Sequence, residues 1–216
     1  MTPLDPDRTL ALAYVPHRTR PAVEVLWRLD AALGAVLAGG RERLISQIKL
    51  IWWRDSLEKL DRERAPAEPV LQAVATHILP TGTTGAELAE MEAPWSVLLD
   101  EHALEPEQLE AYAERGRLLF RLSARLMSPA SDFPIEEAGA LWALVDLARH
   151  SGEPDATAAR EAARGHRGAR RWPSALRPLG MLACLAARDA ARDGAPEPQG
   201  SPARMLSMLR HRLTGR

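Results

Sequence analysis

The residue types that most often carry chemistry are few in this sequence, and their spacing assigns them no role. The one cysteine, Cys184, excludes an intramolecular disulfide and a multi-cysteine metal site, and its apolar neighbours suit a buried thiol. The loop at 80–85 has two glycines but lacks the Gly-Lys-Ser/Thr ending that holds a phosphate. Six histidines show no spacing typical of metal ligands: His17, His77, His102, His150, His166 and His211. The sequence therefore predicts no metal ligand and no cofactor.

Composition indicates one all-α domain that spans residues 1–216. The chain is 46% hydrophobic and 26% charged, which is enough to bury one sizeable core. Helix-forming residues dominate, while Phe and Tyr number two each and β-branched runs are absent. The longest apolar stretch, 178–187, is half of the roughly 20 residues that a helix needs to cross a bilayer. The first residues are acidic where a signal peptide would be basic, so the sequence predicts a cytoplasmic protein.

The charge is distributed unevenly along the chain. Residues 1–159 carry 25 acids and 16 Lys or Arg, whereas residues 160–216 carry 4 acids and 12 Arg, so the two parts are near −9 and +8. The arginines are dispersed along expected helices with few aromatics between them, which argues against a nucleic-acid surface. We expect the basic part to pack over the acidic body. The prolines after 194 separate a basic tail and helix, 194–216, which is also a candidate for peripheral contact with a membrane.

Proline and glycine positions divide the chain into expected helices. Gly39 and Gly40 are expected to end the second of them, and the stretch with Gly152, Gly165 and Gly168 is expected to be a linker. The expected helices cover residues 5–14, 21–38, 41–63, 66–79, a segment from 86, 106–127, 134–150, 173–193 and a short basic segment after 202.

The expected helix at 41–63 contains two adjacent tryptophans. Its apolar residues between Leu44 and Leu60 wrap more than half of the helix, which predicts a position at the centre of the bundle. Adjacent helical residues point about 100° apart. We therefore expect one of Trp52 and Trp53 to be deeply buried and the other to lie nearer a cavity or groove.

Three segments resemble the squalene/phytoene synthase family, whose members are all-helical head-to-head isoprenyl transferases. Residues 48–55, IKLIWWRD, are similar to the family's Arg-Leu-x-Trp-Trp-Arg-Asp stretch, which is the most specific of the three. Residues 5–16, DPDRTLALAYVP, resemble the entry helix, and residues 112–116, YAERG, resemble the middle helix. The resemblance implies an isoprenoid-synthase-like helical bundle with a shortened C-terminal third.

Family members hold magnesium ions between two facing acidic clusters, because a diphosphate must be neutralised before its bond to carbon breaks in an apolar cavity. The first family pattern, Cys-Arg-x-x-Asp-Asp-x-x-Asp, falls on residues 27–35, where the three aspartate positions are Ala31, Ala32 and Ala35. Asp30 is one residue away, which turns its side chain by about 100°. A lone carboxylate there does not form a cluster.

The second family pattern, Gly-x-x-x-Gln-x-x-Asn-x-x-Arg-Asp, falls on residues 139–150. Gly139 and Arg149 match it, whereas the Gln position is Ala143, the Asn position is Asp146 and the metal-binding Asp position is His150. The resemblance therefore implies a catalytically degenerate member, similar in kind to the mitochondrial respiratory complex I assembly factor of that family.

The resemblance names four candidate pocket-lining residues: Arg28, Asp30, Asp146 and Arg149. The plainer interpretation is that they form ordinary ion pairs between helices. We expect no catalytic residue, and a bundle that binds a protein partner or holds a lipid or isoprenoid ligand in its cavity.

The alternative is an active, magnesium-dependent isoprenyl-diphosphate transferase with an unconventional acidic site. It would use Asp30, Asp146, Glu153 and Asp155. Carboxylates that converge across a cavity would favour this enzyme, and carboxylates scattered on the surface would favour the binding protein.

Overall fold

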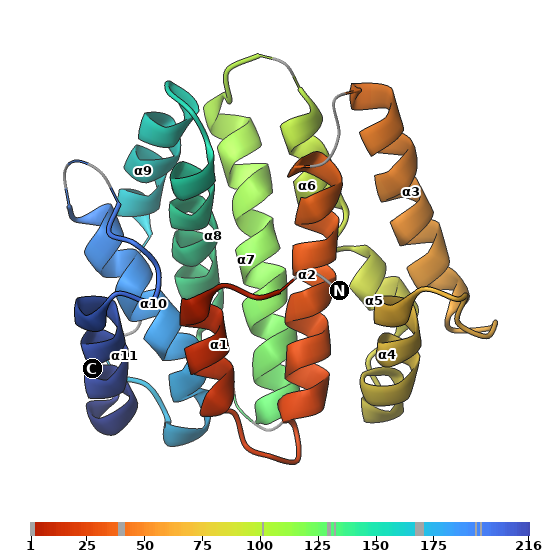
Figure 1. Cartoon of the computed structure of the whole chain (residues 1–216), viewed down its shortest axis with the longest axis horizontal. Coiled ribbons are helices and arrows are strands. Elements are labelled where there is room, and N and C mark those ends of the chain that lie inside the picture. The colour runs from red at the N-terminus through yellow and green to blue at the C-terminus, as the bar shows by residue number, and fades with distance from the viewer. Residues whose placement is uncertain are drawn as a thin grey trace.

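Each regular element in the described part of the chain is a helix, and together these helices form one compact body (Figure 1). The computed structural model describes residues 3–38, 42–100, 102–128, 131, 133–166, 171–192, 194 and 196–216. The predicted helix end at Gly39 and Gly40, and Gly168 of the predicted linker, lie outside the described residues. Within the described residues, no helix combines the length and apolar character that crossing a bilayer requires.

The middle of the body is a pair of long helices, α7 (Pro106–Met127) and α8 (Glu136–His150), with α2 (Arg20–Ala38) packed on the other side of α7. A Cβ atom added to Gly116 would overlap the backbone carbonyl of Gly139, and one added to Gly139 would overlap that of Gly116. The two backbones touch at this crossing because neither helix has a side chain there. The contact fixes the distance between α7 and α8, which both contribute to the candidate site.

Shorter helices cover both ends of this central group (Figure 1). α1 (Pro6–Ala13) begins at the N-cap Asp5 and packs against α10 (Arg177–Ala190), α11 (Pro202–Thr214) and α2. The remaining α-helices are α3 (Arg43–Lys59), α4 (Pro69–His77), α5 (Gly85–Ala89), α6 (Ala93–Ser96) and α9 (Asp155–Gly165). Three 3-10 turns are η1 (Leu79–Thr81), η2 (Val97–Leu99) and η3 (Ser174–Leu176).

The segment expected to be a glycine-rich linker contains the helix α9, so that prediction is wrong. The buried residues of α9 are Ala156, Ala159 and Ala163, which recur every three or four positions and pack toward α8. The stripe is regular, but alanine buries little area, and Gly152 and Gly165 lie on either side of it, which is why the sequence indicates a linker.

α3 lies at one edge of the bundle, so its predicted central position is also wrong (Figure 1). One face of the helix is buried through Leu50, Trp53 and Leu57. The opposite face exposes five large apolar side chains: Leu44, Ile45, Ile48, Ile51 and Trp52. The wide apolar band is therefore two separate apolar faces, one of which has no covering element in the described chain.

The two tryptophans of α3 differ in burial, since Trp53 is 8% exposed and Trp52 is 44% exposed. We expect Trp53→Ala to lower the free energy of unfolding by about 3 kcal/mol, as for a packed aromatic side chain. Trp52→Ala should lower it by less than about 1 kcal/mol, including the loss of its edge contact with Trp53. Chemical denaturation of both variants measures the difference. Equal losses would contradict this assignment of the inner and outer faces of α3.

Candidate functional site

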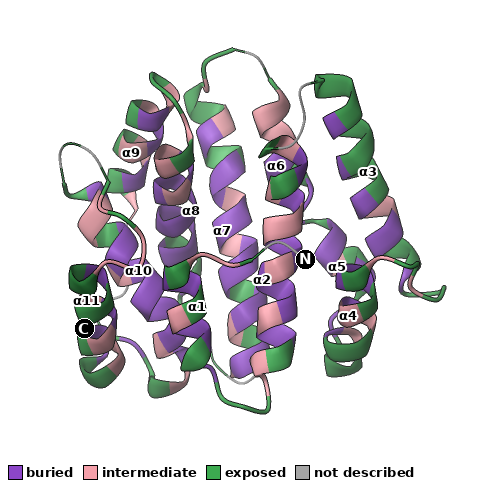
Figure 2. Ribbon diagram, viewed as in Figure 1, coloured by how far each residue is buried: buried purple, intermediate pink, exposed green. Residues whose placement is uncertain are grey.

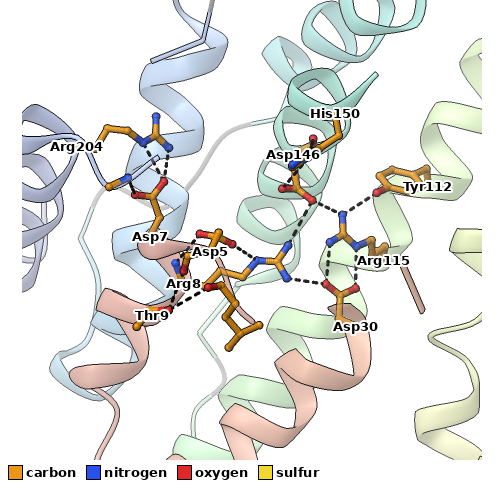
Figure 3. Close-up of polar contacts among 12 residues, drawn as sticks. Asp5, Asp7, Arg8, Thr9, Asp30, Tyr112, Arg115, Asp146, His150 and Arg204 are labelled. Atoms are coloured by element: carbon orange, nitrogen blue, oxygen red, sulfur yellow. Dashed lines mark hydrogen bonds and ion pairs between the residues drawn. The ribbon is translucent and has the colours of Figure 1, made fainter. Parts of the chain in front are cut away.

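Four charged side chains from four helices meet inside the bundle (Figure 3). Arg8 comes from α1, Asp30 from α2, Arg115 from α7 and Asp146 from α8. Asp30 is fully buried, and Arg115 is 2% exposed. We call these four residues the Arg-Asp cluster. It joins helices that are far apart in sequence, and its charges alternate in sign.

Arg115 is at the centre of the cluster and makes hydrogen bonds in three directions. Its Nε and Nη2 donate to the two carboxylate oxygens of Asp30, both at 2.8 Å, which is the bidentate geometry of a strong pair. Its Nη1 donates to Asp146 Oδ2 and to the hydroxyl of Tyr112, both at 2.7 Å. Burial lowers the pKa of Arg115, but the charges of the carboxylates outweigh this and raise it well above its usual value. Arg115 is therefore a permanent cation in the core.

Aromatic rings pack against the Arg115 guanidinium. The guanidinium carbon is 4.1 Å from the ring centre of Trp95 and 4.8 Å from that of Trp142, distances typical of cation–π contacts. Gly34 on α2 makes room for this arrangement, since a Cβ there would come within 2.7 Å of the Trp95 ring. These ring contacts and the hydrogen bonds together hold the guanidinium in one position.

Asp30 accepts more hydrogen bonds than Asp146, the other carboxylate of the cluster. In addition to the two bonds from Arg115, it receives Arg8 Nη1 at 3.1 Å and the indole N–H of Trp95 at 3.3 Å. A carboxylate has about four acceptor sites, so these four donors occupy it fully. Asp30 has no lone pair left with which to bind a metal ion.

Asp146 is bound mainly through one of its two oxygens, and its Oδ1 has a longer contact of 3.6 Å with His150 Nδ1. Its Oδ2 accepts from Arg115 and, at 3.4 Å, from Arg8 Nη2. Burial raises the pKa of Asp146, but the positive charges of Arg115 and Arg8 outweigh it and lower the pKa to about 2. The His150 ring, one turn later, donates from Nδ1 to the Asp146 backbone carbonyl at 2.8 Å. Asp146 therefore remains ionised at neutral pH and leaves its Oδ1 as the less occupied acceptor.

An open cavity of about 450 Å³ lies against the cluster, and its wall is predominantly apolar. α2 contributes Ala31 and Ala35, α8 contributes Asp146 and His150, and Trp95 forms part of the wall. The charged residues in the wall are two cations, Arg8 and Arg115, and two carboxylates, Asp5 and Asp146, so the wall has no excess positive charge. This cavity is large enough for a small apolar ligand.

The structure brings together two of the four residues that the sequence named as pocket-lining. Asp146 lines the cavity and Asp30 lies directly behind it, joined to Asp146 through Arg115. Arg28 is elsewhere, in a salt bridge of 2.7 Å with Glu24 on the same helix. Arg149 is also outside this cavity, where it donates to Asp189 at 2.9 Å and to the Glu197 carbonyl at 2.8 Å.

The other two acids of the alternative enzyme site have local structural contacts. Glu153 is exposed and accepts from the Thr157 amide at 3.2 Å, and Asp155 accepts from the Leu104 amide at 2.9 Å. Asp30 and Asp146 do converge, but they converge on Arg8 and Arg115. Among the described residues, no group of three or more His, Cys, Asp or Glu side chains is placed to hold a metal ion.

The sequence reasoning did not name the two arginines of the cluster as site residues. Arg115 is on the same face of α7 as the buried residues Tyr112 and Leu119, at helical spacing. Arg8 is on the same face of α1 as the buried Leu12. A charged residue within an otherwise apolar stripe indicates a buried ion pair, and this signal could have identified both.

Comparison with known proteins identifies no relative: no family model, no curated protein and no solved structure matches this chain.

Proposed function

We propose that this protein is a non-catalytic, squalene/phytoene synthase-like binding protein that holds one neutral isoprenoid or lipid chain in the cavity beside the Arg-Asp cluster. The proposal rests mainly on one cavity, which is lined by residues 31 and 35 of α2 and by residues 146 and 150 of α8. These are positions at which the family resemblance expects facing acidic clusters. Here α2 presents alanine at them, and the carboxylate of Asp146 is engaged with arginines.

The charges of the cavity favour a neutral ligand over a diphosphate. A diphosphate needs an excess of positive charge, from metal ions or from unpaired basic side chains. Arg8 and Arg115 are both already bound to Asp30 and Asp146. Breaking these pairs to bind an anion would leave buried carboxylates unpaired, which is strongly unfavourable.

The shape and chemistry of the wall favour a small molecule over a segment of a protein partner. Ala31, Ala35 and Trp95 offer an apolar surface, and Asp146 and His150 of α8 are among the polar groups of the same wall. A chain with one terminal hydroxyl fits this wall, because the hydroxyl can donate to Asp146 Oδ1 while the hydrocarbon contacts the apolar surface.

The proposal is tested by measuring the binding of farnesol by calorimetry and by thermal melting, with and without magnesium. Farnesol should bind and raise the melting temperature, and at about 100 times its dissociation constant it should add about 3 kcal/mol of stability. Ala35→Trp, which fills the cavity from α2, should weaken this binding at least about tenfold. Ala111→Trp, at an exposed position of α7, is the matched control and should leave binding unchanged.

Magnesium separates the binding protein from the enzyme. Millimolar magnesium should neither raise the melting temperature of the protein nor support the turnover of farnesyl or geranylgeranyl diphosphate. Magnesium-dependent release of diphosphate that is lost in Asp146→Asn would show that the protein is an enzyme. Farnesol binding that Ala35→Trp leaves unchanged would show that the ligand lies elsewhere.

A further inference from the structure

The exposed large apolar side chains of the described chain fall mainly on α3 and α11, two helices that lie at opposite ends of the bundle (Figures 1 and 2). One group is the outer face of α3. The other is on and beside α11, where Met205, Leu206 and Leu213 are 41%, 69% and 78% exposed and Tyr14 is 37% exposed. Contiguous exposed apolar side chains on a folded protein indicate a surface that contacts another apolar phase or molecule.

The inner face of α11 is fixed to the bundle by buried charges. Arg204 donates from Nε to Asp7 at 2.9 Å and from Nη1 to Asp189 at 2.7 Å (Figure 3 shows its contact with Asp7). Met208 and His211 complete the buried face. Because these contacts fix the rotation of the helix about its axis, Leu206 and Leu213 face outward.

The outer face of α11 combines apolar and basic side chains. Leu206 and Leu213 are two helical turns apart and follow one stripe, which Arg210 borders, and the exposed Arg216 follows the C-cap Gly215 at the end of the helix. Arg212 places its guanidinium carbon 5.5 Å from the ring centre of Tyr14, which adds this aromatic side chain to the same surface. We call Tyr14, Met205, Leu206, Arg210, Leu213 and Arg216 the α11 face.

The charge around the α11 face is of one sign. Residues 201–216 contain no acidic side chain. Among the described residues, the carboxylates that contact α11 are already paired: Asp7 and Asp189 with Arg204, and Glu197 with Arg188 at 2.6 Å. The α3 face differs, because α3 itself carries Asp55 and Glu58. The apolar stripe of α11 with arginines beside it is complementary to a surface that has anionic groups outside and an apolar interior.

We propose that the α11 face binds the surface of an anionic lipid bilayer, with α11 lying in the plane of the headgroups. Leu206 and Leu213 insert at the boundary with the acyl chains, while Arg210 and Arg216 contact lipid phosphates. A nucleic acid would satisfy the arginines but would leave the leucines against phosphate groups. The inference is independent of the cavity ligand, because none of these side chains lines the cavity.

The test measures co-flotation of the full chain with vesicles of phosphatidylcholine alone and with about a third phosphatidylglycerol. Binding should require the anionic lipid and weaken when ionic strength rises from about 0.05 to about 0.5 M, since the Debye length shortens. Arg210→Gln with Arg216→Gln should weaken partitioning about 30-fold, from roughly one kcal/mol per arginine. Leu206→Ser with Leu213→Ser should weaken it at least about tenfold.

The matched control is Leu44→Ser with Ile48→Ser on the α3 face, which removes two equally exposed apolar side chains at the other end and should leave vesicle binding unchanged. Circular dichroism of each variant verifies that it is folded, which the exposure of all these positions leads us to expect. Equal binding to neutral and anionic vesicles, absence of vesicle binding, or loss of binding in the α3 control would overturn the proposal. Binding to a nucleic acid in preference to anionic vesicles would also overturn it.

Discussion

The Gly116→Ala variant should lose more than about 3 kcal/mol of unfolding free energy. An alanine in a helix normally gains up to about 1 kcal/mol over glycine, so helix propensity alone predicts the opposite sign. Here the added methyl group overlaps the Gly139 backbone carbonyl, and α7 and α8 must separate to admit it. Overpacking of a core usually costs about 1–3 kcal/mol, and a clash with backbone cannot be relieved by a side-chain rotation.

Chemical denaturation of Gly116→Ala beside Gly165→Ala measures this effect. Gly165 is also helical, at the end of α9, and has open space around its Cβ position. The control should be unchanged or slightly stabilised. If both variants are as stable as the parent protein, the close contact between α7 and α8 is wrong.

The Arg115→Met variant should lose about 3–5 kcal/mol, because it leaves two buried carboxylates without their main partner. Asp30 loses both bonds of its bidentate pair, and Asp146 loses its shortest one. Arg54→Met is the matched control, since Arg54 pairs with Asp55 at 3.0 Å but both side chains are more than 40% exposed. Its loss should be much smaller, because solvent screens an exposed pair.

The loss in Arg115→Met should also depend on pH. In the parent protein Asp146 has a lowered pKa of about 2, so its stabilising contribution is present above the ordinary carboxyl pKa and is lost as pH falls toward 2. In the variant Asp146 loses the Arg115 charge that opposes its burial, so its pKa should rise and stability should be lost as pH rises. The difference between the two proteins should therefore be smaller near pH 4 than at pH 7. A difference that does not change with pH would contradict the electrostatic explanation, and adding Asp30→Asn to the variant should restore part of its stability.

Most helix positions could be predicted from the sequence because their signals are local. The bounds 106–127 agree with α7, where Pro106 occupies the first turn and an apolar stripe follows. The placement of α3 could not be predicted in the same way. Its sequence shows how much of the helix is apolar, but only the packing of α5 and α2 against it decides which of its two apolar faces is covered.

The candidate site was predictable in part. Asp30 and Asp146 were named because each falls near a position of the family pattern, and both belong to the cluster. Their partners Arg8 and Arg115 were not named, because the pairing joins positions 22 to 138 residues apart along the chain. An isolated sequence shows that a charge falls on an apolar face, but tertiary structure decides which opposite charge meets it.

The position of α1 has a consequence for the order in which the chain folds. Its eight residues are too few for a stable isolated helix, and apart from the local pair of Arg8 with Asp5 its buried charges find their partners on later segments. Asp7 accepts from the Gly200 amide at 3.0 Å and from Arg204, across a separation of nearly 200 residues. Closing a loop of that length is entropically unfavourable until the intervening helices have packed. On a ribosome, α1 would therefore emerge before the other helices and stay hydrated until α11 has been synthesised, so that an early helix in the sequence docks last.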